Sequence, residues 1–235
     1  MNAVATQGDT RHRPVNVAVV DDHEVVHEGI ARILDPQPGI ALTHRFSDGA
    51  DALAALPGTD VDVCIVDLIL RGPGGLEVVS RLRDTAPAIA ALVFTVHPAA
   101  AYGVPSMKAG ASGFLTKGAA PAEIIDAVRT VSDGRLYTPP DLAVMLNARD
   151  ASATPPHTQL SNREFEVFTR LASGQRNSEI SRELGIDQRT VSSYRRRVLD
   201  KLGVDRDAEI VRYALAHDLL GPPAPPEGPP NPAVG

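Results

Sequence analysis

Four short apolar runs, each followed directly by polar residues, constrain the fold of this chain more than any other feature. The runs are rich in Val, Ile, Leu and Ala and lie at 15–20, 61–66, 90–94 and 113–115. They are followed by Asp-Asp, Asp, Thr and Thr-Lys, in that order. Runs that are apolar on both faces are typical of parallel strands buried between helices. A weaker fifth strand candidate lies at 40–46.

Helical spacing of apolar residues separates these strand candidates, at 25–34, 76–82 and 124–131. Strands that alternate with helices predict a doubly wound α/β sheet. Ligands of such sheets bind at the carboxyl ends of the strands. The polar residues that follow the runs should therefore meet at one edge of the sheet; they are Asp21, Asp22, Asp67, Thr95 and Lys117.

The second half of the chain has a different pattern. A Pro-containing stretch of small polar residues at 147–158 is typical of a linker, and 160–220 shows only helical spacing. The Pro- and Gly-rich end should be disordered. We expect five segments: a disordered 1–14, an α/β domain at 15–137, a helix end and linker at 138–158, a helical domain at 159–220 and a disordered tail at 221–235.

Charge is unevenly distributed over the 235 residues, whose formal net charge is −6. Residues 158–220 hold 11 of the 23 basic residues but only 10 of the 29 acidic ones, and a basic cluster lies at 189–201. Such asymmetry hints at nucleic-acid binding. The lone Cys64 excludes an internal disulfide and is interpreted as a core residue. With neither an apolar span nor a signal peptide in the sequence, we expect a cytoplasmic protein.

Three carboxylates, from Asp21, Asp22 and Asp67, would lie at neighbouring strand ends. Clustered carboxylates repel unless a cation or proton neutralises them, and oxygen ligands around a small open site favour Mg²⁺. A Thr hydroxyl and a Lys ammonium nearby would hold phosphoryl oxygens. The set predicts phosphoryl transfer onto a carboxylate. Each residue alone is more often an ordinary loop residue, and we interpret His23 and His97 in that way.

The segments VVDDH, IVDL, FTVH and KAGASGFLTK, within about 15–137, resemble the receiver domain of response regulators. This resemblance implies a five-stranded parallel sheet of flavodoxin-like strand order 2-1-3-4-5. It implies that Asp67 is the phosphoacceptor. It also implies that Mg²⁺ binds Asp22 directly, Asp21 mainly through water, and the main-chain carbonyl of Ile69 as the third protein ligand.

The same resemblance implies a switch. Thr95 would move to bond the phosphoryl group, Lys117 would neutralise it, and Tyr102 falls where the family has its switching aromatic residue. Two departures bear on this switch: Arg71 replaces the family's usual Pro after the phosphoacceptor, and Pro105 lies inside the expected fourth helix. Because an interior Pro removes a hydrogen bond, we expect a kink there.

A small all-α domain of four helices is expected after the linker. Ser161 and Glu164 fit a capping box that begins a helix running to about Ser173. A second helix should span 177–184, and after a turn at Gly185 a third should run from Asp187 to about Leu202. Two helices joined by a tight Gly-containing turn predict a helix-turn-helix, whose second helix enters the major groove. Arg195 to Arg197 could equally be an ordinary solvated helix face.

The stretch LSNREFEVFTRLASGQRNSEISRELGIDQRTVSSYRRRVLDKLGV resembles the LuxR-type domain of the NarL/FixJ family. The resemblance implies that base edges are contacted by Ser192, Ser193 and Arg196. It implies phosphate contacts from Arg189, Thr190, Arg195 and Lys201. It also implies dimerisation through a last helix at about 207–217, with candidate contacts at Ile210, Val211 and Leu215. In this family the unphosphorylated receiver often masks the DNA-binding helix.

We therefore expect a transcriptional regulator of a two-component system rather than an enzyme. A sensor histidine kinase would phosphorylate Asp67 with Mg²⁺, and the active form would be a homodimer on double-stranded promoter DNA, with no membrane contact. One alternative is a phosphorylation-independent DNA-binding regulator whose receiver is only a dimerisation scaffold. Another is a small α/β phosphatase or hydrolase, which would leave the helical half unexplained.

Overall fold

The computed structural model describes residues 13–70, 72–147, 155–217 and 219–220. Its first half contains a parallel sheet of five strands in the order β2-β1-β3-β4-β5, which confirms the predicted fold class. The strands at 15–20 and 40–46 have the predicted bounds, and the third begins at Val63 rather than at position 61. The strands are β1 (Val15–Val20), β2 (Ile40–Phe46), β3 (Val63–Val66), β4 (Ala90–Thr95) and β5 (Gly113–Thr116).

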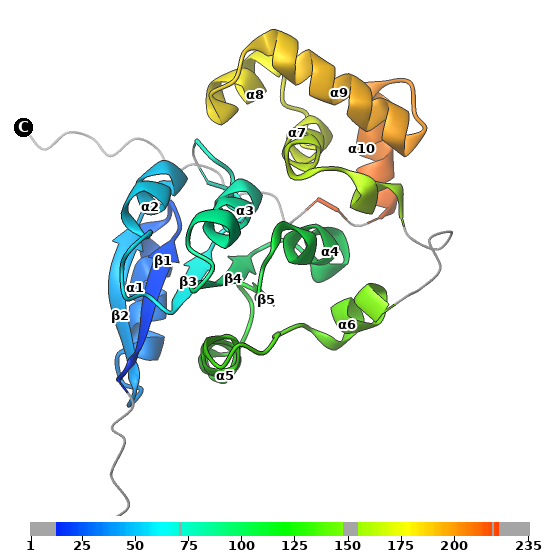
Figure 1. The fold of residues 1–235 in the computed structure, drawn as a ribbon. Coiled ribbons are helices and arrows are strands. Elements are labelled where there is room, and N and C mark those ends of the chain that lie inside the picture. Colours follow the sequence, from blue (N-terminus) through cyan, green and yellow to red (C-terminus); the bar gives the residue numbers. More distant parts are fainter. Residues whose placement is uncertain (1–12, 71, 148–154, 218, 221–235) are drawn as a thin grey trace, which may run out of the picture.

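Helices cover both faces of the sheet, as Figure 1 shows. Val17 and Val19 of β1 pack on the face of helices α1 (Glu24–Leu34) and α5 (Pro121–Ser132). Ala18 and Val20 pack in a second cluster on the other face. The helices of that face are α2 (Gly49–Ala55), α3 (Gly75–Thr85) and α4 (Ala99–Ala109). Because neighbouring residues of a strand point to opposite faces, a strand covered on both sides is continuously apolar.

Helix α4 contains Pro105 without being ended by it, since the helix is continuous from Ala99 to Ala109. Pro105 therefore removes one N–H donor inside the helix without ending it, and the kink at this position stays a prediction. A further helix, α6 (Pro140–Asn147), packs against α4. Gly103 permits this close approach, because a Cβ at that position would lie 2.5 Å from a methyl carbon of Leu142.

The second half is helical, as predicted. It contains the short 3-10 helix η2 (Pro156–Gln159), α7 (Asn162–Ala172), α8 (Asn177–Leu184), α9 (Gln188–Leu202) and α10 (Asp207–Ala216). The predicted capping box is present, because the Ser161 hydroxyl accepts from the Glu164 N–H and the Glu164 carboxylate accepts from the Ser161 N–H. Asp187 caps α9 by accepting from the N–H groups of Arg189 and Thr190.

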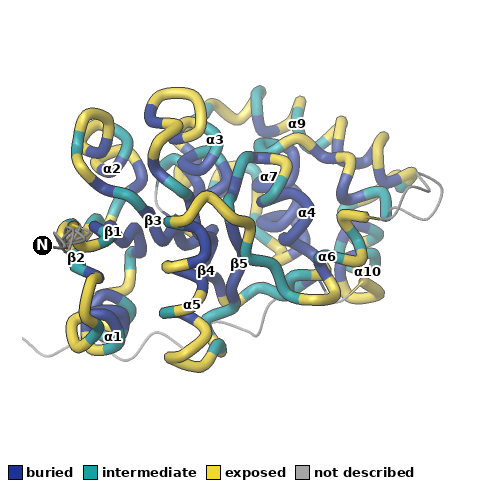
Figure 2. The backbone as a smooth tube through the Cα atoms, turned by 60° about the horizontal axis from the view of Figure 1, so that its bottom comes forward, coloured by how far each residue is buried: buried dark blue, intermediate teal, exposed yellow. Residues whose placement is uncertain are grey.

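The two halves pack directly on each other. Helix α7 contacts both α3 and α4, and η2 also contacts α4. One hydrophobic cluster continues from the α/β domain, at residues such as Val79 and Tyr102, into Phe165 and Phe168 of α7. In Figure 2, buried residues continue from β4 and β5 into α4 and α7. The sequence contains no pattern that predicts this packing.

Several predictions fall on residues that the structure does not describe. Arg71 is one of them, and most of the segments predicted to be disordered, 1–12 and 221–235, are others. Within the described part of the chain, no helix has the length and apolar character needed to cross a membrane.

Candidate functional site

Asp21, Asp22 and Asp67 lie together at the carboxyl ends of neighbouring strands. The N–H of Asp67 donates to the carbonyl of Val20 at 2.9 Å, which holds the end of β3 against the end of β1. Asp21 and Asp67 are buried, with 1 % and 5 % of their surfaces exposed, and Asp22 lies at the rim. The predicted convergence of carboxylates at one edge of the sheet is therefore present.

Lys117 brings a positive charge between two of these carboxylates. It follows β5, and its Nζ lies 2.6 Å from Asp21 Oδ2 and 3.0 Å from Asp67 Oδ2. Burial by itself lowers the pKa of Lys117, but the two carboxylates outweigh burial and hold that pKa above its usual value. For Asp67, burial raises the pKa of the carboxyl group against the opposing effect of Lys117. The ammonium thus opposes the effect of burial on Asp67, because a neighbouring positive charge favours the ionised carboxylate.

Thr95 lies at the end of β4, fully buried beside the same edge of the sheet. Its hydroxyl accepts a weak hydrogen bond from the N–H of His97 at 3.4 Å. The ring of His97 stacks on that of Tyr102, with 4.4 Å between the ring centroids. Burial lowers the pKa of His97 to about 4, and Lys117 adds to that shift, so the imidazole is neutral at pH 7. Thr95, His97 and Tyr102 therefore form a continuous contact that begins at the acidic site.

The four groups that could hold a metal ion are Asp21, Asp22, His23 and Asp67, whose ligand atoms all lie within 4.8 Å of one another. The Nδ1 of His23 lies 3.1 Å from Asp21 and 2.9 Å from Asp22. We interpreted His23 from sequence as a loop residue, and its side chain is 62 % exposed. The three carboxylates supply the oxygen ligands that a hard divalent cation prefers. Ile69, whose carbonyl is the other predicted ligand, lies exposed in the following loop.

The loop after Asp67 turns so tightly that it requires glycine at its end. The N–H of Gly75 donates to the carbonyl of Leu68 at 3.0 Å. A Cβ at Gly75 would lie only 2.0 Å from the main-chain oxygen of Asp67. Gly74, one residue earlier, lies against the carboxylate of Glu166 in α7, where a Cβ would be 2.3 Å from Oε1. The same loop therefore contacts the acidic site and the helical domain.

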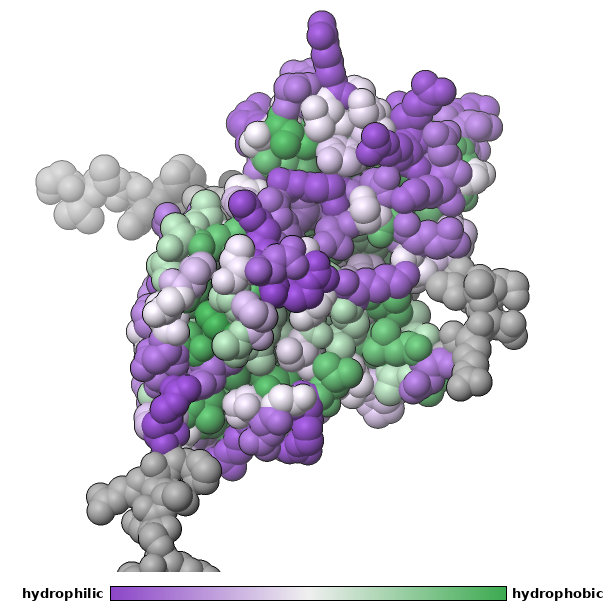
Figure 3. All heavy atoms as spheres, viewed as in Figure 1, coloured by the Kyte–Doolittle hydropathy of each residue, from purple (hydrophilic) through white to green (hydrophobic). Residues whose placement is uncertain are grey.

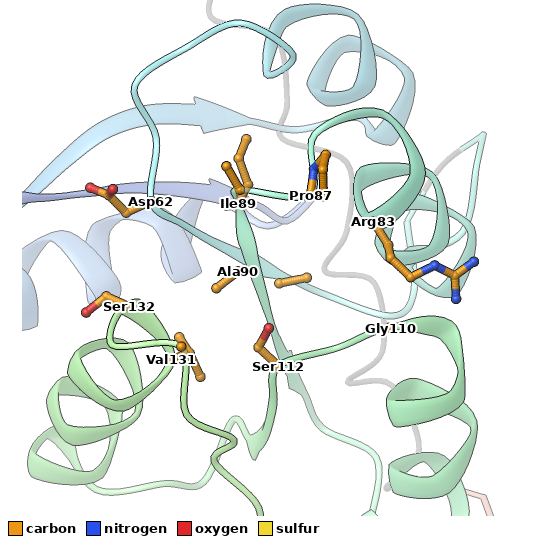
Figure 4. A pocket seen from close by; sticks show the side chains of 12 residues that line it. Asp62, Arg83, Pro87, Ile89, Ala90, Gly110, Ser112, Val131 and Ser132 are labelled. Atoms are coloured by element: carbon orange, nitrogen blue, oxygen red, sulfur yellow. The ribbon is translucent and has the colours of Figure 1, made fainter.

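A separate cavity of about 230 Å³ lies away from the acidic site, at the opposite edge of the sheet. Figure 4 shows its walls, where Asp62 and Ile89 precede strands β3 and β4 and Val131 comes from α5. Asp62 is already engaged there, because it accepts hydrogen bonds from the side chain of Arg13 and the N–H of Asn16. This cavity contains none of the predicted site residues.

Helix α9 presents most of the predicted DNA contacts to solvent. Ser192, Ser193, Arg196 and Arg189 are exposed, and Thr190 is half-buried. In this arrangement the α/β domain does not cover these side chains, in contrast to the masking that the family resemblance implied. The buried side of α9 carries Val191, Val198, Leu199 and Leu202, as the helical spacing predicted.

Two other predicted phosphate contacts are engaged within the protein. Arg195 forms an ion pair with Asp207 of α10, with 2.6 Å between Nε and Oδ1. The Nζ of Lys201 lies 2.6 Å from Glu164 and donates to the carbonyl of Gln159. Burial raises the pKa of Glu164, but hydrogen bonds from Lys201 and Ser161 outweigh burial and hold it below its usual value. A phosphate contact by Arg195 or Lys201 would therefore compete with an existing ion pair.

The predicted dimer contacts on α10 differ in exposure. Ile210 is fully buried in the core of the helical domain, so in this arrangement it has no surface to offer a second copy. Leu215 is 63 % exposed and Val211 is half-buried. Helical spacing places the three residues on neighbouring faces of α10 but does not indicate which face packs against α7. In the structure, Ile210 lies on the buried face.

Two family models match the chain. The model of the response regulator receiver domain matches residues 17–129, and that of the luxR family of bacterial regulatory proteins matches residues 158–214. The chain belongs to the response regulator family. It is a DNA-binding transcriptional response regulator of two-component systems, with a receiver domain and a LuxR-type helix-turn-helix domain. The finer domain boundaries, at 137 and 159, stay predictions.

Curated relatives are similar over nearly their whole length. Response regulator UvrY of Escherichia coli strain K12 is 36 % identical over 208 residues, which cover 87 % of this regulator and 95 % of UvrY. Transcriptional regulatory protein UhpA of Salmonella typhimurium strain LT2 is 39 % identical over 206 residues, which cover 88 % of this regulator and 98 % of UhpA. These relatives confirm the NarL/FixJ family resemblance of both halves.

A solved structure shows the same fold. RcsB from Salmonella enterica serovar Typhimurium, bound to promoter rprA in the presence of the phosphomimetic BeF3−, has a TM-score of 0.67 and 24 % sequence identity. The match covers 86 % of this response regulator and 98 % of that chain. The match shows that both halves of this chain have the fold of that solved protein.

Proposed function

We propose that this response regulator accepts a phosphoryl group on Asp67 from a sensor histidine kinase, and that phosphorylation controls DNA binding by α9. The observation that supports this proposal most is the position of Lys117. Its ammonium lies between Asp21 and Asp67, and its main-chain N–H donates to the carbonyl of the buried Thr95 at 2.7 Å. A carboxylate nucleophile, a cation and a hydroxyl donor at one strand edge suit a transferring phosphoryl group.

The donor set fits Mg²⁺. Asp21, Asp22 and Asp67 supply three carboxylates, and the exposed loop at Ile69 offers a main-chain carbonyl. In our proposal Asp22 and the Ile69 carbonyl bind the ion directly and Asp21 acts mainly through water. A bound Mg²⁺ would neutralise charge on the phosphoryl oxygens.

The residues of this chain need to supply only a nucleophile and groups that hold the phosphoryl oxygens. A carboxylate oxygen of Asp67 forms a bond to phosphorus, while the P–N bond of the kinase phosphohistidine breaks and the histidine leaves. The ammonium of Lys117 and the hydroxyl of Thr95 then hold two oxygens of the aspartyl phosphate. We propose that the regulator acts as a substrate of its kinase and not as an enzyme on small molecules.

Labelling tests the phosphoacceptor. The full chain is incubated with labelled acetyl phosphate, with Mg²⁺ or with EDTA, and compared with Asp67→Asn. We expect stoichiometric labelling of the native chain only with Mg²⁺ and none of the variant. Labelling of the variant would overturn the assignment to Asp67. No labelling of either protein, together with normal DNA binding, would favour the phosphorylation-independent alternative.

The contact between Tyr102 and α7 supports a route from phosphorylation to DNA binding. Tyr102 stacks on His97 on one side and meets Phe165 edge-on at 4.8 Å on the other. We propose that bonding of Thr95 to the phosphoryl group shifts His97 and Tyr102 and thereby changes the docking of α7. The receiver would then bias an equilibrium between two domain arrangements.

For DNA, we propose that Ser192, Ser193 and Arg196 contact base edges, because these side chains are exposed on the helix that follows the tight turn. Arg189, Thr190, Arg195 and Lys201 would contact phosphates, the last two after leaving their ion pairs. Arg196→Ala should weaken specific binding by about 1–3 kcal/mol. Arg212→Ala, at an exposed position of α10, is the matched control. Operator affinity that is equal in both variants would remove Arg196 from the readout set.

We also propose that the phosphorylated form is a homodimer on two half-sites. Support comes from α10, where Leu215 is exposed and Val211 is half-buried at the surface of the helical domain. Leu215→Glu should keep Asp67 labelling and abolish dimerisation of the phosphorylated chain in sedimentation. A dimer that survives this change would exclude α10 as the dimer contact.

A further inference from the structure

An open groove of about 500 Å³ lies between the receiver and the helical domain. Four cationic side chains line it: Arg83 of α3, Lys108 of α4, Arg163 of α7 and Arg197 of α9. Tyr194 of α9 lines it as well, and none of its lining residues within the described part of the chain is acidic. Figure 3 shows hydrophilic side chains gathered where the helical domain meets the receiver. The groove is therefore a positively charged surface shared by both domains.

The two receiver cations are held in place. Arg83 lies in the last turn of α3, and its aliphatic stem packs on Gly110, where a Cβ would be 2.7 Å from Arg83 Cδ. Figure 4 shows Arg83 extending from α3 across the end of α4 at Gly110. The Nζ of Lys108 donates to the carbonyl of Thr158 at 2.8 Å. The charge of Lys108 is thereby held against the helical domain, and the stem of Arg83 is held at the end of α4.

Much of this charge is not neutralised within the protein. Arg163 is neutralised, because it forms ion pairs with Glu77 at 2.5 Å and with Glu166 at 2.6 Å. Arg83 shares an exposed ion pair with Asp84. Arg197 lies over the ring of Tyr194 at 5.7 Å. Among the residues that the structure describes, neither Lys108 nor Arg197 pairs with a carboxylate.

The recognition helix indicates what fills the groove. Tyr194 and Arg197 lie on α9, next in sequence to the exposed Ser193 and Arg196 of the proposed base-reading face. A duplex bound by that face would pass beside the groove and bring its phosphates toward the receiver cations. We propose that the groove binds the DNA phosphate backbone, so that Arg83 and Lys108 of the receiver contribute directly to DNA affinity. This proposal rests on the proposed role of α9.

If Arg83 and Lys108 only stabilised the receiver fold, their replacement would affect DNA binding differently. Arg83 and Lys108 each lie in the last turn of a helix, where a cation stabilises the helix dipole. Loss of that role would lower stability but leave DNA affinity unchanged once the protein is folded. Phosphate contacts release counterions instead, so their loss changes the salt dependence of binding.

The test measures binding of the full chain to a random-sequence DNA duplex over a range of salt concentrations. Arg83→Ala/Lys108→Ala should reduce the slope of log affinity against log salt by about 2, since each phosphate contact contributes about 1. The control Arg32→Ala/Arg135→Ala removes the same charge, from exposed positions on α1 and after α5, on the other face of the sheet. The control should keep the native slope.

An unchanged slope in the groove variant, or an equal reduction in the control, would overturn the proposal. If the alanine variant unfolds, Arg83→Gln and Lys108→Gln singly should each reduce the slope by about 1, and Arg83→Lys should retain it. Binding of ATP that depends on Arg83 while the DNA slope stays native would assign the groove to a small anion and reject DNA. Failure of the base-reading proposal is separate: it would appear as equal operator affinity of Arg196→Ala and Arg212→Ala, while the groove variant still shows its reduced salt slope.

Discussion

Tyr102 of α4 and Phe165 of α7 meet edge-on, with 4.8 Å between the ring centroids and an interplanar angle of 86°. They belong to different domains, and both are almost fully buried. Since Tyr102 also stacks on His97, two residues from Thr95, one side chain joins the acidic site to the helical domain. Aromatic pairs of this geometry contribute about 0.5–1.5 kcal/mol beyond their buried area.

Replacing Tyr102 should separate phosphorylation from DNA binding. In Tyr102→Leu the ring contacts with His97 and Phe165 are lost, whereas labelling of Asp67 needs neither ring. Coupling free energies between sites are about 1–3 kcal/mol, so the expected 5- to 150-fold effect of phosphorylation on DNA affinity should fall toward 1. Titration of operator DNA with and without acetyl phosphate measures this. Tyr102→Phe keeps the ring and should respond normally; a normal response of Tyr102→Leu would contradict the proposed route.

Lys117 should be replaceable in part by a divalent cation. Lys117→Gln removes the ammonium between Asp21 and Asp67, and breaking a buried ion pair costs about 3 kcal/mol. Mg²⁺ that binds the folded state more tightly should restore part of this loss by mass action. Thermal unfolding with and without Mg²⁺ tests the prediction, which requires a larger Mg²⁺-induced rise in Tm for the variant than for the native chain. Equal rises would mean that Lys117 does not neutralise the metal site.

Gly75 should tolerate no side chain, because a Cβ there would collide with the main chain of Asp67. Gly75→Ala should destabilise the fold by at least about 2 kcal/mol, a cost typical of overpacking in a tight site. The matched control is Gly29→Ala in α1, where a Cβ has nothing within 4 Å. That change should stabilise the protein by up to about 1 kcal/mol through helix propensity. Urea unfolding measures both variants, and equal effects would show that the loop after Asp67 rearranges freely.

His157 should make stability depend on pH. Burial lowers its pKa to about 4, with a further contribution from His217, and its ring contacts the hydroxyl of Tyr213 at 3.0 Å. The unfolded chain protonates this imidazole below about pH 6.5. The stability that the neutral ring contributes is therefore complete above about pH 6.5 and is lost as the pH falls toward 4. His157→Gln should unfold in urea with a weaker pH dependence in that window. An unaltered pH dependence would show that His157 titrates normally.

The acidic site was predictable because its chemistry lies at strand ends. Apolar runs at 15–20 and 90–94 and the residues that follow them determine which side chains meet at the edge of a parallel sheet. The helices of the DNA-binding half were predictable for a similar reason, since capping residues such as Ser161 and Asp187 are local signals. Helices α2 and α6 were not predicted, because their short sequences show little apolar periodicity.

The sequence by itself determined the convergence of Asp21, Asp67 and Lys117 and the limits of α7 to α9, because these depend on local periodicity and on residues adjacent to strand ends. The sheet order followed from the family resemblance. Tertiary structure alone decided what lies between the domains and which face of α10 is buried. The pair Glu77 and Arg163, the edge contact of Tyr102 and the burial of Ile210 join residues far apart in the chain. No local pattern encodes such contacts, because they depend on how two finished surfaces fit together.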